Sequence, residues 1–324
     1  MAKVTVVIPF FQRQHGLLTR ALNSICLQNT AAQIVVLVVD DESPVDPAGE
    51  VPDNLPAHVS VQILKQKNGG PGAARNLGLA HAPTDTEYVA FLDSDDQWLP
   101  DHLRNAIAAL GDSYDLYFAN HFEPDLTVDE FSRRKLLILA EHRALAQGSR
   151  CFEFIGDMRD QIIRANIIET STVVYRWNGL NKVRFKPEYR NAFEDHLFWM
   201  DIASLARGIA FSADVECQYG RGVSIWRSSE LGSEYSFLRI IDQLRFIHAV
   251  TTSESTTPTQ AKSLQNIKTG ARRTFVAEFL HRARRNADID WQSILTILKM
   301  DPQLILLAAP IATQIALKRT KKFN

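Results

Sequence analysis

The sequence predicts an α/β fold: a mostly parallel sheet flanked by helices, followed by a helical C-terminal extension. The first observation is a set of continuous β-branched runs, VTVVI (4–8) and IVVLVV (34–39), which are typical of buried parallel strands. The second is the helical spacing of apolar residues between these runs, which indicates repeated βαβ units. The third is the mainly helical pattern that begins at residue 234.

The first hundred residues give these elements in regular order. Leu18, Leu22 and Ile25 recur at helical spacing between the first two strands. A third strand is expected at 59–64, followed by a glycine-rich turn at 69–72, a helix through His81 and a strand at 88–92. We therefore expect residues 1–100 to form one half of the body of the protein.

Beyond residue 99 the regular alternation of strands and helices ends. A helix is predicted over 101–110, mixed segments follow to about 174, and a basic, turn-rich stretch (178–190) precedes a helix that begins with Glu194 and Asp195. The extension is helical, with a Ser/Thr-rich linker at 251–259. We expect a second half of the body at 101–230 and the extension at 231–324.

Composition excludes several classes of protein. The chain has 324 residues, 45% of them hydrophobic, which is enough for a full core and excludes disorder and collagen-like repeats. Cys26, Cys151 and Cys217 lie far apart without a CxxC pair, so these cysteines give neither a disulfide framework nor a zinc site. A reducing compartment is the natural expectation.

Charge is distributed unevenly along the chain. Residues 264–324 carry eleven Lys+Arg and four Asp+Glu, whereas the remainder carries 25 and 33. The acidic body argues against a nucleic-acid partner. We expect no signal peptide, and the longest apolar stretch (304–317) is shorter than the roughly 18 residues that span a bilayer.

The residues that directly follow the predicted strands are acidic or break the strand. They are Pro9 and Phe10 after the first strand, Asp40 and Asp41 after the second, and Asp93, Asp95 and Asp96 after the strand at 88–92. Ligands of open α/β sheets bind beyond the carboxyl ends of the strands. Repelling carboxylates at one edge predict a cation there.

The segment FLDSDD (91–96) is the sharpest of these signals. Asp93 and Asp95, separated by Ser94, offer oxygen ligands to a hard divalent ion, Mn²⁺ or Mg²⁺, bound to a nucleotide diphosphate. Such an ion would neutralise the charge of a departing diphosphate. The alternative is an Asp-rich turn that caps the next helix, and it best fits Asp96.

The glycine-rich turn at 69–72 lacks both the Walker lysine and GxGxxG, so neither a P-loop nor a Rossmann dinucleotide site is supported. Arg75 is the functional candidate here, because its planar guanidinium can hold a base or phosphate. The alternative is an arginine on the surface of a helix.

Glu194 and Asp195 have two interpretations. Acids in a first helical turn are favoured by the helix dipole alone. Alternatively, Asp195 is a general base that accepts a proton from an acceptor hydroxyl.

Five motifs, which follow one another over roughly residues 3–230, resemble those of the family 2 glycosyltransferases with the GT-A fold. They are VTVVIPFFQR, VVDDES, NGGPGAARNLGL, FLDSDDQWLP and EDHLFWM. The string CQYGRGVSIW (217–226) resembles bacterial exopolysaccharide enzymes of the succinoglycan type. The resemblance implies a nucleotide-binding half at 1–100 and an acceptor-binding half at 101–230.

The resemblance also implies roles for individual residues. Pro9 and the main chain of Phe10 would approach the nucleoside, Asp41 the uracil, Arg75 the base or phosphate, and Asp93 with Ser94 the ribose or sugar. Asp95, with Asp93, would bind the metal. Asp195 would be the base and Glu194 a secondary acid near the acceptor.

The implied reaction is an inverting transfer of a hexose, glucose above all, from a UDP-sugar to a saccharide acceptor, a lipid-linked oligosaccharide for example. One departure concerns the metal. Many relatives place a histidine where this chain has Tyr219, Gly220, Arg221 and Gly222, so Arg221 is expected to contact the diphosphate instead. His196, alone on its helix, is expected to be structural.

The basic extension predicts peripheral contact with the inner face of the cytoplasmic membrane in a cytoplasmic protein. Apolar residues Phe275, Val276, Phe279 and Leu280 accompany the cations Arg272, Arg273, Arg282, Arg284 and Arg285, and Lys318, Arg319, Lys321 and Lys322 follow an apolar run. The alternatives are a helical subdomain packed on the body and an oligomer contact. For function, the alternatives are a nucleotidyltransferase with a related sheet and a sugar-nucleotide-binding protein without turnover.

Overall fold

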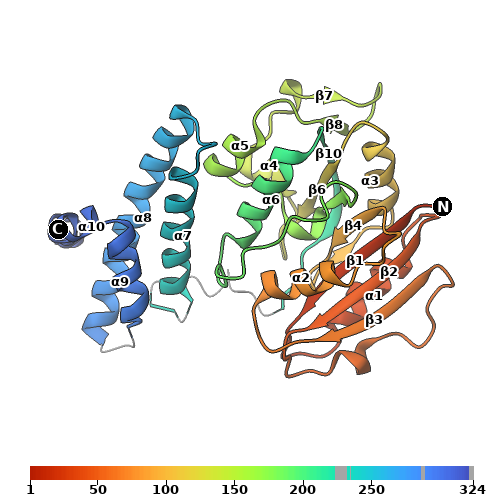
Figure 1. The fold of residues 1–324 in the computed structure, drawn as a ribbon, viewed down its shortest axis with the longest axis horizontal. Coiled ribbons are helices and arrows are strands. Elements are labelled where there is room, and N and C mark those ends of the chain that lie inside the picture. The colour runs from red at the N-terminus through yellow and green to blue at the C-terminus, as the bar shows by residue number, and fades with distance from the viewer. Residues whose placement is uncertain (223–231, 234, 286–288, 321–324) are drawn as a thin grey trace. The chain divides into compact units, whose positions relative to one another are not determined.

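The computed structural model describes residues 1–222, 232–233, 235–285 and 289–320. The chain divides into two compact units, one of Met1–Arg190 with Glu194–Val223 and the other of Asn191–Phe193 with Ser224–Asn324 (Figure 1). The boundary expected at residue 230 lies outside the described residues.

Within the described residues, ten strands form a single sheet in the first unit. Its order is β3 (Val59–Lys65), β2 (Gln33–Asp40), β1 (Lys3–Phe10), β4 (Tyr88–Phe91), β9 (Val174–Arg176), β6 (Leu116–Phe122), β10 (Ile209–Gln218), β8 (Cys151–Glu153) and β7 (Arg143–Ala144). A short strand, β5 (Gln97–Trp98), pairs with β10. The predicted mostly parallel sheet is confirmed.

Strand direction brings distant parts of the chain to one edge of the sheet. Strand β1 is parallel to β2 and β4, and β6 is parallel to β10. Strand β9 is antiparallel to both β4 and β6, so β6 runs in the same direction as β4. The carboxyl ends of β1, β2, β4, β6 and β10 therefore meet at one edge, which we call the acidic edge, and β9 begins there.

The helices of this unit cover both faces of the sheet. They are α1 (Leu17–Cys26), α2 (Pro71–Ala80), α3 (His102–Leu110), α4 (Glu130–Arg134), α5 (Met158–Arg164) and α6 (Glu194–Leu205). Because side chains alternate along a strand, Val6 and Ile8 of β1 join Leu22 of α1 and Leu103 of α3 in one buried cluster. Val7 faces the other way and packs against α2.

An aromatic cluster fixes α6 to the same face as α2. Phe91 of β4 contacts Phe198 and Trp199 of α6, with ring centroids 5.9 Å apart in both pairs. Phe185 stacks on Phe198 at 3.9 Å. Since these rings are fully buried, the first turn of α6 is held in place by the core.

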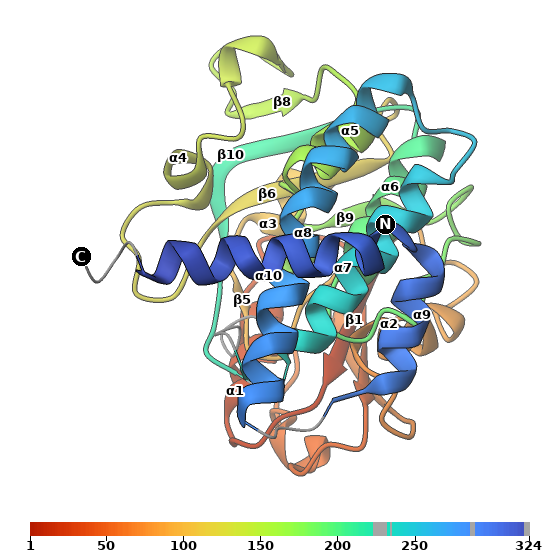
Figure 2. The same ribbon diagram turned by 90° about the vertical axis from the view of Figure 1, so that its left-hand side faces the viewer.

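The second unit is helical, as predicted. It contains α7 (Ser236–Thr251), α8 (Pro258–Arg285), α9 (Trp291–Met300) and α10 (Gln303–Thr320). Helices α7 and α8 lie side by side, and α10 crosses α8 (Figure 2). Phe237 of α7 stacks on Phe275 of α8 with centroids 5.6 Å apart. By length and apolar content, no single helix among the described residues qualifies as a membrane span; α9 and Gln303–Leu317 qualify only together, bent by 109°.

The sequence interpretation of α8 as a lipid-facing helix is wrong in part. Arg272 donates to both carboxylate oxygens of Asp301, and Arg282 binds Glu278. Both arginines are buried, as are Phe275 and Val276. A guanidinium that is desolvated in an internal ion pair is not available to a lipid phosphate, and its apolar neighbours are used in helix packing.

Candidate active site

The acidic edge carries the residues that the sequence singled out. The strand order β3-β2-β1-β4 reverses between β1 and β4, and in open α/β sheets the ligand crevice lies at such a reversal. Pro9 and Phe10 end β1 there, and Asp93 follows β4 directly after Leu92. The fold thus brings the segments of the first four strands together where a nucleotide would bind.

Asp41 organises the glycine-rich turn. Its Oδ1 accepts hydrogen bonds from Gly69 N and Gln66 Nε2, both at 2.7 Å, and its Oδ2 accepts from Gly70 N at 2.9 Å. The main-chain N–H of Asp41 in turn donates to the carbonyl of Phe10 at 2.9 Å. Asp41 is therefore buried and links the ends of β1 and β2 to the start of α2. Its predicted contact with uracil stays a prediction.

The four residues Asp93–Asp96 occupy different environments. Asp93 and Asp95 are partly buried, and 38% of the side chain of Asp93 is exposed. Ser94 is buried and accepts a hydrogen bond from Gln12 Nε2 at 2.9 Å. Asp96 is also buried and accepts from Ser171 Oγ and from Gly220 N. Burial, reinforced by the charges of Asp95 and Asp93, raises the pKa of Asp96 well above its ordinary value, which fits a structural carboxyl.

The segment after β10 lies directly against Asp95. Gly222 N donates to Asp95 Oδ2 at 2.6 Å, and a Cβ atom on Gly220 would overlap the carbonyl of Asp95. Glycine is required at Gly220 for this close approach. Arg221 between them is paired with Asp125 in the loop after β6. Its predicted contact with a diphosphate stays a prediction.

Arg75 joins the two sides of the site. It is buried on α2, where Nη2 donates to Asp93 Oδ1 at 2.8 Å and Nη1 to Glu194 Oε1 at 3.2 Å. Burial alone would lower the pKa of Arg75. The charges of Asp93 and Glu194 outweigh burial, so the pKa of Arg75 is raised above its ordinary value. The interpretation of Arg75 as a surface arginine is wrong, because the guanidinium bridges two carboxylates from distant parts of the chain.

Glu194 and Asp195 are neighbours with opposite pKa shifts. Burial, together with the charge of Asp195, raises the pKa of Glu194 to about 7. Burial also favours a raised pKa for Asp195, but His196 outweighs it and the net pKa is lowered. Asp195 Oδ1 accepts from both the main-chain N–H of His196 at 2.7 Å and its ring Nδ1 at 2.8 Å. A carboxylate that stays ionised at neutral pH can act as a base.

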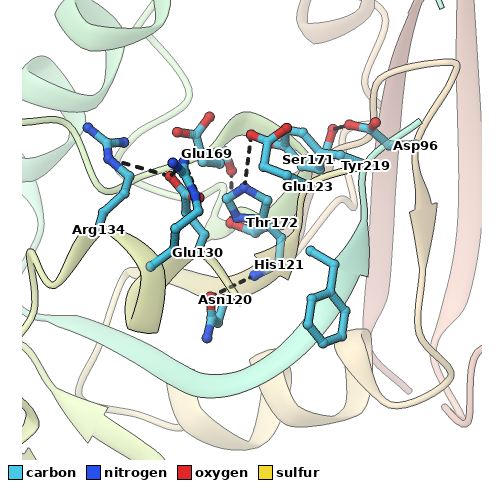
Figure 3. A network of polar contacts seen from close by, with 12 residues as sticks. Asp96, Asn120, His121, Glu123, Glu130, Arg134, Glu169, Ser171, Thr172 and Tyr219 are labelled. Atoms are coloured by element: carbon cyan, nitrogen blue, oxygen red, sulfur yellow. Dashed lines mark hydrogen bonds and ion pairs between the residues drawn. The ribbon is translucent and has the colours of Figure 1, made fainter. Parts of the chain in front are cut away.

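The structure adds residues that sequence reasoning missed. His196 is the first: it was expected to be structural, and the structure places it in contact with Asp195. Glu169 lies just before β9, and burial raises its pKa to about 7 (Figure 3). Ser171 donates to Asp96, and Tyr219 stacks on the ring of His121. The position of Tyr219 after a strand was a usable signal, whereas Glu169 lies in an irregular segment without any.

The residues at the acidic edge fit a divalent cation. Asp93 and Asp95 provide carboxylate oxygens from one turn, the donor type that Mg²⁺ and Mn²⁺ prefer. Asp93 is partly exposed, so its oxygens are accessible from solvent.

Comparison with protein families identifies the class of protein. Residues 5–176 match the model of the glycosyl transferase family 2, so the chain belongs to this family and is a glycosyltransferase with the GT-A fold. The chain is 32% identical over 318 residues to the succinoglycan biosynthesis protein ExoW of Rhizobium meliloti, covering 96% of this chain and 98% of that protein. It is also 31% identical over 123 residues to the Campylobacter jejuni GalNAc(5)-diNAcBac-PP-undecaprenol beta-1,3-glucosyltransferase, covering 37% of this chain and 38% of that one.

Solved structures show the same fold. The S. aureus TarS 1-349 fragment in complex with UDP-GlcNAc superimposes with a TM-score of 0.60 at 19% identity, covering 94% of this chain and 81% of that one. The mannosyltransferase PcManGT from Pyrobaculum calidifontis, in complex with GDP-Man and Mn²⁺, has a TM-score of 0.55 at 16% identity, covering 98% and 84%.

Proposed function

We propose that this protein is an inverting hexosyltransferase of exopolysaccharide synthesis that transfers glucose from UDP-glucose to a saccharide acceptor, with Asp195 as the general base. One observation carries the proposal. Arg75 binds both Asp93, at the donor side of the acidic edge, and Glu194, the residue before Asp195. A sugar held at Asp93 and Asp95 would therefore have its reacting carbon close to the carboxylate of Asp195.

Each step of the proposed transfer uses a named group. The acceptor hydroxyl gives its proton to the Asp195 carboxylate as its oxygen forms a bond to the anomeric carbon. The bond from that carbon to the diphosphate oxygen breaks at the same time, and UDP leaves with the electron pair. Attack from the opposite face inverts the configuration, so an α-linked donor yields a β-glycoside. General-base catalysis contributes about 10² to 10⁴ in rate.

The ion that Asp93 and Asp95 would hold, Mn²⁺ or Mg²⁺, would supply positive charge to the departing diphosphate. The side chains of the protein would position the reacting groups. Arg75 keeps the carboxylates of Asp93 and Glu194 at fixed positions. Asp195 is 22% exposed, so a hydroxyl from outside the protein reaches it.

The acceptor and the donor are supported by relatives of known role. The succinoglycan biosynthesis protein, similar over nearly its full length, supports a polysaccharide pathway. The similarity to a glucosyltransferase whose acceptor is linked to undecaprenyl diphosphate supports glucose and a lipid-linked acceptor. The fold neighbours that bind UDP-GlcNAc or GDP-Man are consistent with a nucleotide-sugar donor.

The experiment that tests the proposal is a comparison of Asp195→Asn with wild type across a panel of UDP-sugars, with product analysis by mass spectrometry using lipid-linked acceptors. The amide is isosteric but cannot accept the proton. We expect UDP binding to be retained and transfer to fall by about 10² to 10⁴.

The matched control is Asp201→Asn, which lies on the same helix and pairs with Lys186 at the surface. This variant should transfer at the wild-type rate. Transfer by Asp195→Asn at the wild-type rate would remove Asp195 from the mechanism, and binding without turnover by wild type on every sugar would favour the non-catalytic alternative.

We further propose that the protein is cytoplasmic and contacts the inner face of the membrane through α9 and α10. Trp291, Leu295, Ile305 and Leu306 of these helices are all more than half exposed. Lys318 and Arg319 follow in the sequence, and Lys321 and Lys322 lie outside the described residues. Exposed apolar side chains next to cations are the combination that binds anionic lipid. Such contact would hold the protein at the membrane that carries lipid-linked acceptors.

A further inference from the structure

A buried histidine at the end of β6 is not used by the proposed reaction. His121 is fully buried, and neither of its ring nitrogens has a hydrogen-bond partner in the part of the chain that the structure describes. Its Nε2 is 3.7 Å from Glu123 Oε1, which is too long for a hydrogen bond. Buried polar groups are normally satisfied. The imidazole therefore calls for a ligand that the protein atoms do not provide.

Carboxylates surround this imidazole. Glu123 follows His121 by two residues, and Glu130 is the first residue of α4. The three side chains each offer one ligand atom, and these atoms lie within 4.8 Å of one another. Figure 3 shows the ring of His121 among Glu123, Glu130 and Glu169. The ring also stacks on Tyr219, with centroids 4.3 Å apart, which fixes its orientation.

We propose that His121, Glu123 and Glu130 bind a divalent transition-metal ion of the zinc type, at a site separate from Asp93 and Asp95. Zinc takes imidazole nitrogen and carboxylate oxygen at about 2.0–2.2 Å, so two ligand atoms of a tetrahedral site lie about 3.4 Å apart. Atoms that lie within 4.8 Å of one another reach this spacing by approaching by at most about 1.4 Å, which the rotatable side chains of Glu123 and Glu130 allow. An imidazole ligand disfavours Mg²⁺ and Ca²⁺, which prefer oxygen.

Glu130 already has two arginine partners. Arg133 Nη2 donates to Glu130 Oε1 at 2.8 Å, and Arg134 Nε lies 3.4 Å from the same oxygen. Both arginines are three or four residues away on the same short helix and reach solvent. Glu130 itself is buried and Arg133 binds both of its oxygens, so a metal ion has to replace these pairs with its own charge when it takes this carboxylate. The guanidinium groups then return to water.

Three protein ligands leave a coordination position open. Catalytic zinc sites with three protein ligands keep water or a substrate oxygen in the fourth position. Because β6 ends at the acidic edge, the site lies on the same edge of the sheet as Asp93 and Asp95. The bound ion would thus be accessible to a hydroxyl-bearing ligand.

The test is metal binding, measured by equilibrium dialysis with elemental analysis, in a chain that carries Asp93→Asn and Asp95→Asn. These substitutions remove the first cation site. We expect this chain to retain about one Zn²⁺ per molecule and to bind Mg²⁺ poorly. Adding His121→Asn should weaken Zn²⁺ binding by at least the roughly 10- to 100-fold that loss of a ligand's hydrogen-bond partner costs, because here the ligand itself is removed. The exposed His81→Asn is the matched control and should leave Zn²⁺ binding unchanged.

A second variant protects the test against misfolding of the buried His121→Asn. Glu123 has 35% of its side chain exposed, so Glu123→Gln should fold and should weaken Zn²⁺ binding as well. Zn²⁺ should also raise the melting temperature of the chain with Asp93→Asn and Asp95→Asn, and not of the chain that also carries Glu123→Gln. Equal Zn²⁺ binding with and without Glu123→Gln, or no Zn²⁺ bound once Asp93 and Asp95 are changed, would overturn the proposal.

Discussion

Charge pairing between single residues sets the chemistry of the candidate site. Arg75 is buried between Asp93 and Glu194, so its charge is compensated by two carboxylates. Removing one partner of a buried pair leaves the other charge uncompensated and costs several kcal/mol. Lysine at this position has a point charge and cannot bridge both acids with the fixed geometry of a guanidinium.

The pair of Asp195 and His196 makes the proposed base sensitive to pH. The charged groups that act on Asp195 are His196, Arg75, Glu194 and Glu169. Because the pKa of Asp195 is lowered, its carboxylate should stay ionised down to the acid side of its ordinary pKa, about 4. Replacing His196 by Gln removes the positive charge, and the pKa of Asp195 should rise. We predict that the acid limb of the pH profile of kcat/KM moves to higher pH.

The pH profile separates this role from a structural one. His142→Gln changes a histidine that contacts Phe154 and Phe211, far from Asp195 in sequence, and should leave the limb in place. A uniform loss of activity in His196→Gln, with an unmoved limb, would contradict the assignment.

One glycine of α2, Gly78, allows this helix to pack closely against β1. Gly78 faces Val7 of β1, and a Cβ atom built on Gly78 would lie 2.4 Å from Val7 Cγ1. Val7 is fully buried in a central strand and cannot move aside. We predict that Gly78→Ala reduces the free energy of unfolding of α2 by about 1–3 kcal/mol, despite the higher helix propensity of alanine. Hydrogen exchange of α2 peptides measures the change.

Gly270 of α8 is the matched control. A Cβ atom on Gly270 meets nothing within 4 Å, so Gly270→Ala should stabilise its helix by about 0.5–1 kcal/mol. If both substitutions slowed exchange in their helices, steric contact at Gly78 would not be the deciding factor.

At the scale of the whole molecule, the excess of positive charge in the C-terminal extension is part of the proposed binding to a membrane surface. The proposed lipid contact depends on Leu306, which is 78% exposed on α10. We predict that the full-length chain co-sediments with vesicles that contain anionic phosphatidylglycerol. Leu306→Glu should bind them about tenfold more weakly, because it loses apolar burial and adds a like charge.

Leu27 provides the control for this experiment. It is 68% exposed at the end of α1, in the other unit, and Leu27→Glu should leave vesicle binding unchanged. Equal binding of Leu306→Glu and wild type, or no binding by wild type, would show that α10 does not contact lipid and would favour a protein-packing role.

Much of the fold was predictable because its signals are local. Strands β1, β2 and β4 are continuous apolar runs, and the start of α6 at Glu194 follows from acids before an apolar stretch. The interpretation of α8 failed for the opposite reason. Arg272 and Arg282 look like surface cations along a helix, and only their partners Asp301 and Glu278 show that they are internal.

The sequence by itself determined the family, the α/β architecture and the aspartates at the strand ends, because a hydrophobic run and the residues after it are contiguous in the chain. Only the tertiary structure decided which carboxylates share the guanidinium of Arg75 and which lie beside His121. Arg75 meets Asp93, 18 residues away, and Glu194, 119 residues away, and His121 meets Glu130 only where β6 and α4 pack together. The energy of an ion pair and the binding of a metal ligand depend on distances of a few ångströms between atoms. No local pattern in the sequence records those distances.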